Sequence, residues 1–278
     1  MTEIQTNRPE YILRNDPAVG SNLPLYGKRI VLTRAVEQSV DSTKDLLENG
    51  AEIVLFPAIE FERMPVTQKV SEQVASNYYD YIIFTSANAV KYFFDQLPET
   101  VHPGRELTAK CISIGEKTSK VLATYVSNVF YVGKAGTSVE FLAELSQFDF
   151  AGKNILLPAS KIARTELPDG LKALGANAEL IHVYNTIEPH KEKLTEIISD
   201  IRVNGADCFI FTSPSTFANF ISMMEINSPG DFFTHSLIAA IGRTTADYIC
   251  SRGVSTAIVP SKPGMAELTK AIITFYQK

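Results

Sequence analysis

The stretch GKRIVL at residues 27–32 has a close counterpart in GKNILL at residues 152–157, and this correspondence decides the fold. The distance along the chain from one stretch to the other is 125 residues, from Gly27 to Gly152. The dipeptide Gly50-Ala51 recurs as Gly175-Ala176 with the same offset. Matches at a constant offset indicate a duplicated unit of about 125 residues.

Two more matches lie further along the unit, at an offset of 127 residues. An insertion or deletion of two residues explains the change of offset. Four matches in the same order and at nearly constant spacing favour a single internal duplication. The later matches pair Asp80 and Phe84-Thr85-Ser86 with Asp207 and Phe211-Thr212-Ser213, and Ile114-Gly115 and Thr118 with Ile241-Gly242 and Thr245.

Short apolar runs alternate with segments of helical periodicity in both copies. Apolar runs of about four residues are typical of strands that are covered on both faces. The alternation predicts an α/β fold with doubly wound parallel sheets and helices on both faces. The expected strands are 30–33, 53–56, 81–84, 111–114, 155–157, 180–183, 208–211 and 237–241, and the expected helices are 40–49, 88–97, 118–125, 166–174, 215–224 and 244–251.

The composition excludes several classes of protein. The 26 Lys and Arg against 31 Asp and Glu give a net charge of −5, so a general attraction for nucleic acid or an anionic membrane is not expected. No apolar run is long enough to cross a bilayer, and residues 1–26 lack the apolar core of a signal peptide. We interpret residues 1–26 as a loosely attached N-terminal extension and expect a cytoplasmic monomer.

The cysteine and histidine content predicts neither disulfides nor a metal site. Cys111, Cys208 and Cys250 are odd in number and far apart, which favours reduced core residues of a cytosolic protein. The four histidines show no ligand spacing with these cysteines. We expect no metal and no cofactor.

Hydroxyl residues follow two equivalent strands. Thr85-Ser86 and Thr212-Ser213 each end an apolar run and open a helix, at the strand ends where doubly wound sheets bind ligands. Free backbone N–H groups of a helix start can bind an anion there. Simple capping of the helix by the serine hydroxyl is the alternative interpretation.

A glycine turn follows the next strand in each copy. Gly115 and Thr118 match Gly242 and Thr245, and Thr244 precedes the second threonine. Glycine lets a ligand approach the backbone closely. The turns fit neither a Walker A loop nor GxGxxG, so nucleotide binding by an α/β enzyme is weakly supported.

Four other residues complete the candidate site. Thr33-Arg34 follows the first strand, and Arg164 follows the counterpart of that strand in the second copy. Arginine binds carboxylates through two parallel hydrogen bonds. A surface arginine in a local ion pair is the alternative interpretation for both arginines. Tyr184 ends a strand in the second copy. A phenol can donate a proton to a departing hydroxyl, although its ordinary pKa of about 10 makes it a weak acid. A packed aromatic ring is the alternative for Tyr184.

Taken in order, these elements resemble the uroporphyrinogen-III synthase family. The resemblance covers essentially residues 28–278, and the ordered set of motifs is more specific than any one of them. The segments that carry it are VLTRAVEQ, LLENGAEIVLFPAIEF, YDYIIFTSANAV, SIGEKTSKVL, LLPASKIARTELPDGLKALGA, VYNT, FIFTSPSTFANF and AAIGRTTADYI.

The resemblance implies two doubly wound lobes joined by a two-stranded linker. Residues 27–57 and 188–278 would form lobe one, and residues 58–187 lobe two. The implied reaction cyclises hydroxymethylbilane, a linear tetrapyrrole with eight carboxylates, with loss of water and inversion of ring D through a spiro-pyrrolenine. The implied partner is this small-molecule substrate, with a possible hand-over from hydroxymethylbilane synthase.

The resemblance also assigns roles. Tyr184 matches the tyrosine usually proposed as the acid of the family, and Thr118 and Thr245 match its two Gly-x-x-Thr turns. Ser86, Ser213 and Thr244 match positions that line its cleft. A non-catalytic bilobal module that binds a tetrapyrrole or small anion is the alternative function.

Overall fold

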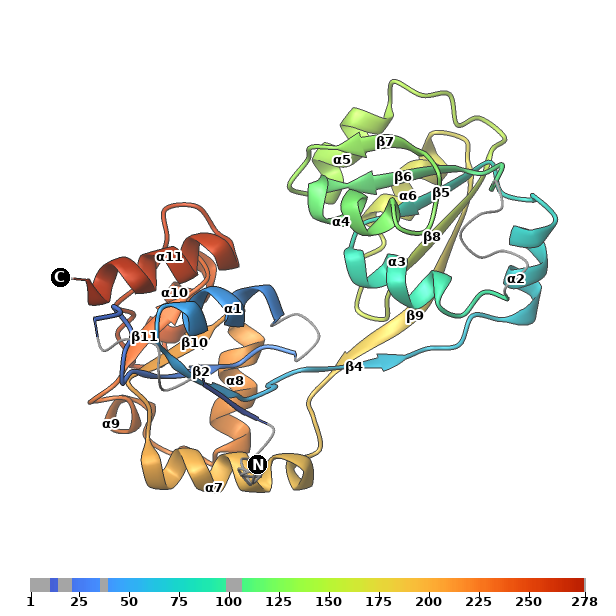
Figure 1. Ribbon diagram of the computed structural model, residues 1–278. Helices are drawn as coiled ribbons and strands as arrows, with labels where there is room; N and C mark the ends of the chain where they lie inside the picture. The colour runs from blue at the N-terminus through green and yellow to red at the C-terminus, as the bar shows by residue number, and fades with distance from the viewer. Residues whose placement is uncertain (1–10, 15–21, 36–39, 99–106, 278) are drawn as a thin grey trace, which may run out of the picture. The chain divides into compact units, whose positions relative to one another are not determined.

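The computed structural model describes residues 11–14, 22–35, 40–98 and 107–277 of the 278-residue chain (Figure 1). These residues form two compact units, and each has its own sheet. Unit 1 contains the described residues up to Glu60 together with those from Ile187 onward. Unit 2 is the continuous stretch Phe61–Thr186.

The sheet of unit 1 has the strand order β1-β3-β2-β10-β11. Its four central and outer strands β3, β2, β10 and β11 run parallel, and the short β1 pairs antiparallel with β3. The strands are β1 (Ile12–Leu13), β2 (Arg29–Leu32), β3 (Glu52–Leu55), β10 (Cys208–Phe211) and β11 (Leu237–Ala240).

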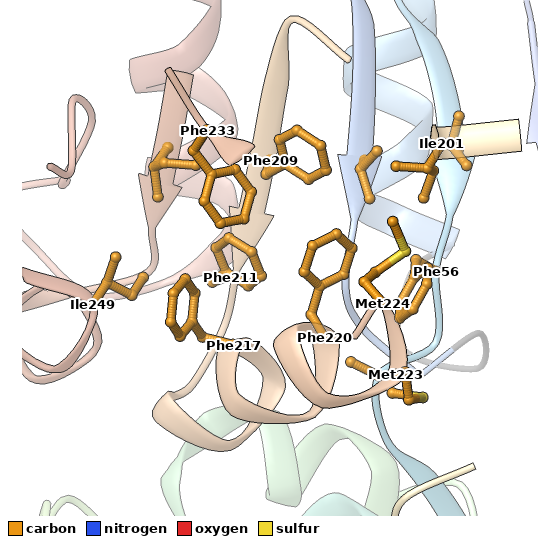
Figure 2. Close-up of a cluster of buried hydrophobic side chains, with 14 of the residues drawn as sticks. Phe56, Ile201, Phe209, Phe211, Phe217, Phe220, Met223, Met224, Phe233 and Ile249 are labelled. Carbon is orange, nitrogen blue, oxygen red and sulfur yellow. The ribbon is translucent and has the colours of Figure 1, made fainter. Parts of the chain in front are cut away.

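Alternate residues of each central strand enter two different cores, as expected for a sheet that is covered on both faces. Phe209 and Phe211 of β10 point into an aromatic cluster with helices α7, α8 and α10 (Figure 2). Cys208 and Ile210 face the other side, where α1 and α11 pack. The helices are α1 (Val40–Glu48), α7 (Thr195–Asn204), α8 (Pro214–Met223), α9 (Pro229–Phe232), α10 (Arg243–Cys250) and α11 (Met265–Tyr276).

Unit 2 repeats this plan. Its sheet has the order β4-β9-β8-β5-β6-β7, and β9, β8, β5, β6 and β7 run parallel. Helices α2, α3 and α4 cover one face and α5 and α6 the other. The strands are β4 (Glu60–Arg63), β5 (Tyr81–Phe84), β6 (Lys110–Ile114), β7 (Val129–Gly133), β8 (Asn154–Ser160) and β9 (Asn177–Ile187), and the helices are α2 (Gln68–Ala75), α3 (Ala87–Phe94), α4 (Gly115–Leu122), α5 (Ser138–Leu145) and α6 (Glu166–Ala173).

Each unit combines half of each sequence repeat. Unit 1 pairs β2 of the first repeat with β10 of the second, and unit 2 pairs β8 of the second with β5 of the first. The registers correspond: Ile30 lies opposite Cys208, and its repeat equivalent Ile155 lies opposite Tyr81. The orders β3-β2-β10-β11 and β9-β8-β5-β6 are therefore the same order written in equivalent strands.

An aspartate clamp fixes this pairing in both units. The Asp207 carboxylate accepts the backbone N–H of Arg29 at 2.8 Å, and the Asp80 carboxylate accepts that of Asn154 at 2.9 Å. In return, each aspartate donates its own backbone N–H to the carbonyl of the same residue, at 2.8 and 2.9 Å. A lysine contacts each carboxylate; the ion pairs are Lys28–Asp207 at 3.1 Å and Lys153–Asp80 at 3.6 Å.

The chain passes between the units within two strands that are neighbours in one sheet. The first boundary lies between Glu60 and Phe61 in β4, and the second between Thr186 and Ile187 in β9. The expected fold class, α/β with two mostly parallel sheets, is confirmed. No helix among the described residues is long and apolar enough to cross a membrane.

Two expectations are wrong. The described part of the N-terminal extension is not loosely attached, because Ile12 pairs with Val54 at the sheet edge and Leu25 is fully buried. Residues 1–10 and 15–21 lie outside the described residues. Cys250 is exposed and not a core residue, because it follows the buried Ile249 on α10 and lies on the outer side of that helix.

Burial does explain the other two thiols. Cys111 and Cys208 are buried on central strands, and burial raises the pKa of each thiol to about 12. A thiol with so high a pKa stays protonated and unreactive at neutral pH. These two cysteines therefore act as small apolar core residues.

The aspartate clamp generates a prediction about stability. We expect Asp80→Ala and Asp207→Ala each to lower the free energy of unfolding by about 1–3 kcal/mol, because each leaves a strand N–H without its acceptor. Asp→Asn should cost less, because the amide oxygen can still accept that N–H. Urea unfolding followed by circular dichroism measures both, with the exposed Asp247→Ala of α10 as a control expected to stay within about 0.5 kcal/mol. Equal losses for the clamp and control variants would contradict the structural role.

Candidate active site

The predicted site residues of unit 2 lie at one edge of its sheet. Because β5, β6, β8 and β9 are parallel, their carboxyl ends meet at the same edge. Tyr184 of β9 lies opposite Ser160 in the last pair of residues between β9 and β8. The other site residues follow the strands: Thr85 and Ser86 follow β5, Gly115 and Thr118 open α4 after β6, and Arg164 follows β8.

Tyr184 is enclosed by polar and aromatic partners from α3 and β4. Only 7% of its surface is exposed. Its phenol oxygen lies 3.3 Å from the Ser86 hydroxyl, and either group can be the donor. The Tyr92 ring stacks on the Tyr184 ring with centroids 5.3 Å apart and 22° between the planes. The Phe61 ring meets it edge to face at 5.7 Å and 82°.

Helix α3 also holds the backbone that carries Phe61. The Tyr92 hydroxyl donates to the carbonyl of Phe61 at 3.4 Å. One turn further, the Gln96 side chain donates to the carbonyl of Met64 at 3.1 Å and accepts the backbone N–H of Val66 at 3.2 Å. These bonds tie β4 and the segment after it to α3, which Ser86 caps, and to the turn that follows this helix.

The repeated serines cap helices. The Ser86 hydroxyl accepts the N–H of Ala89 at 3.1 Å, and the Ser213 hydroxyl accepts that of Thr216, also at 3.1 Å. Ser213 and Thr216 form a reciprocal capping box. Capping therefore accounts for both serines, but only Ser86 combines it with a contact to a tyrosine hydroxyl among the described residues.

The other predicted residues of unit 2 differ in exposure. Thr85 and Arg164 are exposed, whereas Thr118 is 6% exposed on the first turn of α4. Gly115 has φ +73°, a left-handed conformation that favours glycine where the chain turns from β6 into α4. Beneath this turn, the Ser113 hydroxyl is buried and has no hydrogen-bond partner among the described residues.

In unit 1, the turn after β11 opens into a pocket of about 840 Å³. This volume lies within the range of small-molecule sites. The Thr245 side chain lines it, is 3% exposed, and makes no side-chain hydrogen bond with any described residue. A Cβ added to Gly242 would lie 3.1 Å from Pro263, so glycine keeps this wall of the pocket close. The lining residues are Ile241 to Asp247, Val259, Pro260, Ser261 and Pro263.

The chemistry of this pocket suits a carboxylate. Free N–H groups of the first turn of α10 carry partial positive charge, and a hydroxyl and a guanidinium lie beside them in Thr245 and Arg243. Thr244 is exposed in the same turn. Local donors of this kind can bind an anion even though the whole chain is acidic.

Thr33 and Arg34 lie at the end of β2, in the same unit. The Thr33 side chain is 0% exposed, and its hydroxyl donates to the carbonyl of Ile210 at 2.7 Å. That bond ties the end of β2 to β10 and leaves no exposed surface on the side chain. Arg34 is partly buried, and desolvation lowers the pKa of its guanidinium.

The described residues contain no cluster of three or more His, Cys, Asp or Glu side chains that suits a metal ion. The structure also brings in residues that sequence reasoning missed. Phe61, Tyr92 and Gln96 lie far from Tyr184 in sequence, and no motif connects them. The segment Val259–Pro263 of the pocket did offer a signal, because its proline and serine content marks a turn.

Comparison with known proteins adds the deciding observation. The family model described as Uroporphyrinogen-III synthase HemD matches residues 41–270. The chain belongs to the uroporphyrinogen-III synthase family. A uroporphyrinogen-III synthase of Chlorobaculum parvum is 25% identical over 248 residues, which cover 88% of this chain and 98% of that protein. One of Synechococcus elongatus is 27% identical over 232 residues, which cover 80% of this chain and 86% of that protein.

Solved structures of the family share the fold. A crystal structure of uroporphyrinogen-III synthetase from Helicobacter pylori has a TM-score of 0.56 at 19% identity, and covers 89% of this chain and 99% of its own. A mutant uroporphyrinogen III synthase from Thermus thermophilus has a TM-score of 0.55 at 17% identity, with 90% and 99% covered. At these identities the likeness supports the fold alone.

Two threonines in unit 1 differ in the role of the side-chain hydroxyl: that of Thr33 makes a buried hydrogen bond, whereas that of Thr245 makes none with the described residues. We expect Thr33→Val to lower the free energy of unfolding by about 1 kcal/mol, because it removes a buried hydrogen bond. Thr245→Val should change it by less than about 0.5 kcal/mol, because its hydroxyl has no partner among the described residues. Urea unfolding of the two isosteric variants tests this. A larger loss for Thr245→Val would show that its hydroxyl is used within the fold.

Proposed function

We propose that this chain is a lyase that cyclises hydroxymethylbilane to uroporphyrinogen III, with loss of water, in tetrapyrrole biosynthesis. Membership of the family over residues 41–270 supports this function. So do relatives of the same name that align over nearly their whole length. The structural observation that carries the proposal is the Tyr184 phenol, held beside Ser86 at the carboxyl edge of the unit 2 sheet.

In the proposed first step, Tyr184 assists the departure of the terminal hydroxyl. The lone pair of the ring A nitrogen expels this hydroxyl, which takes the phenol proton and leaves as water. The products are an azafulvenium cation and a phenolate. The Ser86 hydroxyl can donate to that phenolate over the 3.3 Å contact. A weak acid is adequate because the pyrrole nitrogen provides the main driving force.

The later steps conserve atoms and return the proton. The substituted α-carbon of ring D attacks the cation and forms a spiro-pyrrolenine. The bond from the spiro carbon to the methylene next to ring C then breaks, leaving a second azafulvenium cation on ring C. The free α-carbon of ring D attacks this cation and loses its proton, which restores the tyrosine. Water is the only other product.

Binding must decide the orientation of ring D, because unassisted closure gives the symmetrical isomer. Holding two reacting carbons in the correct geometry accelerates a reaction by making it effectively unimolecular. We propose that the pocket around Thr245 binds one of the substrate carboxylates. The Thr33 side chain has no exposed surface, so we do not propose it as a contact. The predicted contacts for the other carboxylates stay Arg34, Thr85, Gly115, Thr118, Arg164, Ser213, Gly242 and Thr244.

Several finer statements belong to the same proposal. We propose that the two units act as the lobes of the enzyme, that it works in the cytoplasm as a monomer, and that it needs neither metal nor cofactor. Hand-over of the unstable linear substrate from hydroxymethylbilane synthase is also part of the proposal. The family resemblance supports these statements.

A coupled assay tests the function. Hydroxymethylbilane synthase supplies the linear tetrapyrrole in the presence of the purified chain, and chromatography separates type I from type III uroporphyrin after oxidation. We expect mainly type III product. Type I alone, at the spontaneous rate, would refute the proposed activity. Tight tetrapyrrole binding with an unchanged isomer ratio would instead support a non-catalytic binding module.

The role of Tyr184 generates a separate prediction. We expect Tyr184→Phe to lower kcat by about ten-fold or more. General acid–base assistance usually contributes about 10²–10⁴-fold, and the pyrrole nitrogen reduces the demand on the acid here. The ring contacts stay in this variant, so its fold should be preserved. Thermal unfolding and circular dichroism provide the control. Wild-type turnover would remove the Tyr184 hydroxyl from the mechanism.

A further inference from the structure

We propose that Tyr92 is a positioning residue for Tyr184, which fixes the phenol through ring stacking and through its bond to the backbone of Phe61. The inference rests on the proposed function and deepens it. It concerns the orientation of the proton donor, and assigns to Tyr92 no contact with substrate.

The geometry restricts the Tyr184 ring on two sides. Tyr92 lies against one face, with 22° between the ring planes, and Phe61 presses against the ring at 82°. Swinging of the Tyr184 side chain about its Cα–Cβ bond, which would move the phenol oxygen, would have to displace one of these neighbours. The two rings thereby hold the phenol oxygen at the Ser86 hydroxyl. Small misplacements of a reacting group are costly to catalysis, so this restriction matters.

Both partners of Tyr184 on α3 belong to one fixed helix. Ser86 caps its start, and Tyr92 lies one and a half turns later. The helix is anchored in the same core by Val90, Phe93 and Phe94, which are at most 1% exposed. The Tyr92 hydroxyl also donates to the Phe61 carbonyl, so the third ring is held by the same residue.

The duplication provides an internal comparison. At the repeat offsets, Tyr92 corresponds to Asn219 of α8, and Tyr184 corresponds to Ile59. Asn219 donates to the carbonyl of Ala58 at 2.8 Å, much as Tyr92 donates to that of Phe61. Both units thus have a bond from this helix position to a carbonyl of the first repeat, although at the repeat offset of 125 residues Ala58 corresponds to Val183 and not to Phe61. An aromatic ring at this position is present only where the equivalent strand carries Tyr184, so the fold does not require it.

A matched control lies on the same side of the sheet. Tyr125 stacks on Phe94 at 5.0 Å and 15°, and its hydroxyl donates to Asp95 at 2.8 Å. Tyr125 thus has a stacking partner and a hydrogen bond, as Tyr92 does, but none of its contacts named here involves Tyr184. Removing the Tyr125 ring therefore measures how much stability unit 2 loses with one ring stack, while the Tyr184 phenol stays in place.

The experiment compares Tyr92→Leu, Tyr92→Phe and Tyr125→Leu in the full chain, in the isomer-resolved coupled assay. We expect Tyr92→Leu to lower kcat about ten-fold while KM changes less than about two-fold. The variant displaces the phenol but leaves the residues that bind the substrate in place. Tyr92→Phe should lower kcat much less than Tyr92→Leu does, since it keeps the stack and loses only the bond to the Phe61 carbonyl. Tyr125→Leu should keep kcat within about two-fold of wild type, although it should lose about as much thermal stability as Tyr92→Leu. If Tyr92→Leu does not fold, Tyr92→Asn replaces it, since the equivalent residue of unit 1 is Asn219.

A double variant separates positioning from general damage. In a Tyr184→Phe background, Tyr92→Leu should cause little further loss of kcat, because residues that act as one unit are strongly non-additive. A full additional ten-fold loss would overturn the inference, and so would wild-type kcat in Tyr92→Leu. Neither result affects the proposed activity, which fails only if the wild-type chain forms no type III product.

Discussion

The fold depends on the parallel pairing of strands from different sequence repeats, and one aspartate in each unit determines its register. Asp207 exchanges two hydrogen bonds with Arg29, and Asp80 exchanges two with Asn154. The carbonyls of the same aspartates accept the N–H groups that start β11 and β6, at 2.8 Å in each case. A single residue thus aligns three strands. Because a parallel pair displaced by one residue would reverse which side chains enter each core, this alignment also determines the two hydrophobic layers of each unit.

A consequence of this constraint is that both units present equivalent strand ends, whereas their chemistry differs. Unit 1 offers a pocket with free donors at the start of α10. Unit 2 offers a phenol enclosed by Tyr92 and Phe61. The positions equivalent to Tyr184 and Tyr92 are Ile59 and Asn219, so the same scaffold forms in unit 1 without these tyrosines. In the proposed reaction, therefore, the duplicated framework is shared and the acid belongs to unit 2.

The sequence predicted the fold well where apolar runs and repeats coincide. The central strands at 81–84 and 208–211 are found as predicted, because four consecutive apolar residues covered on both faces leave little ambiguity. Elements outside the repeat pattern were missed. β7 and α5 belong to this group, although Thr137 and Glu140 form a capping box whose spacing marks the start of α5. The site was predictable only residue by residue: Tyr184 and Ser86 lie in recognisable segments, whereas the stacking of Tyr92 follows from tertiary packing of residues 92 positions apart.

Enclosure of the phenol also explains how a weak acid can serve a reaction that makes a cation. The azafulvenium cation reacts readily with water, so the chemistry benefits from a donor with few water molecules around it. Tyr184 is 7% exposed, and the rings of Phe61 and Tyr92 lie against it. The negative faces of aromatic rings favour a nearby cation. The same enclosure makes the orientation of the phenol sensitive to its neighbours, since a group with little room cannot recover its position by moving. In the proposed mechanism, therefore, the packing around Tyr184 contributes to catalysis as well as to the core.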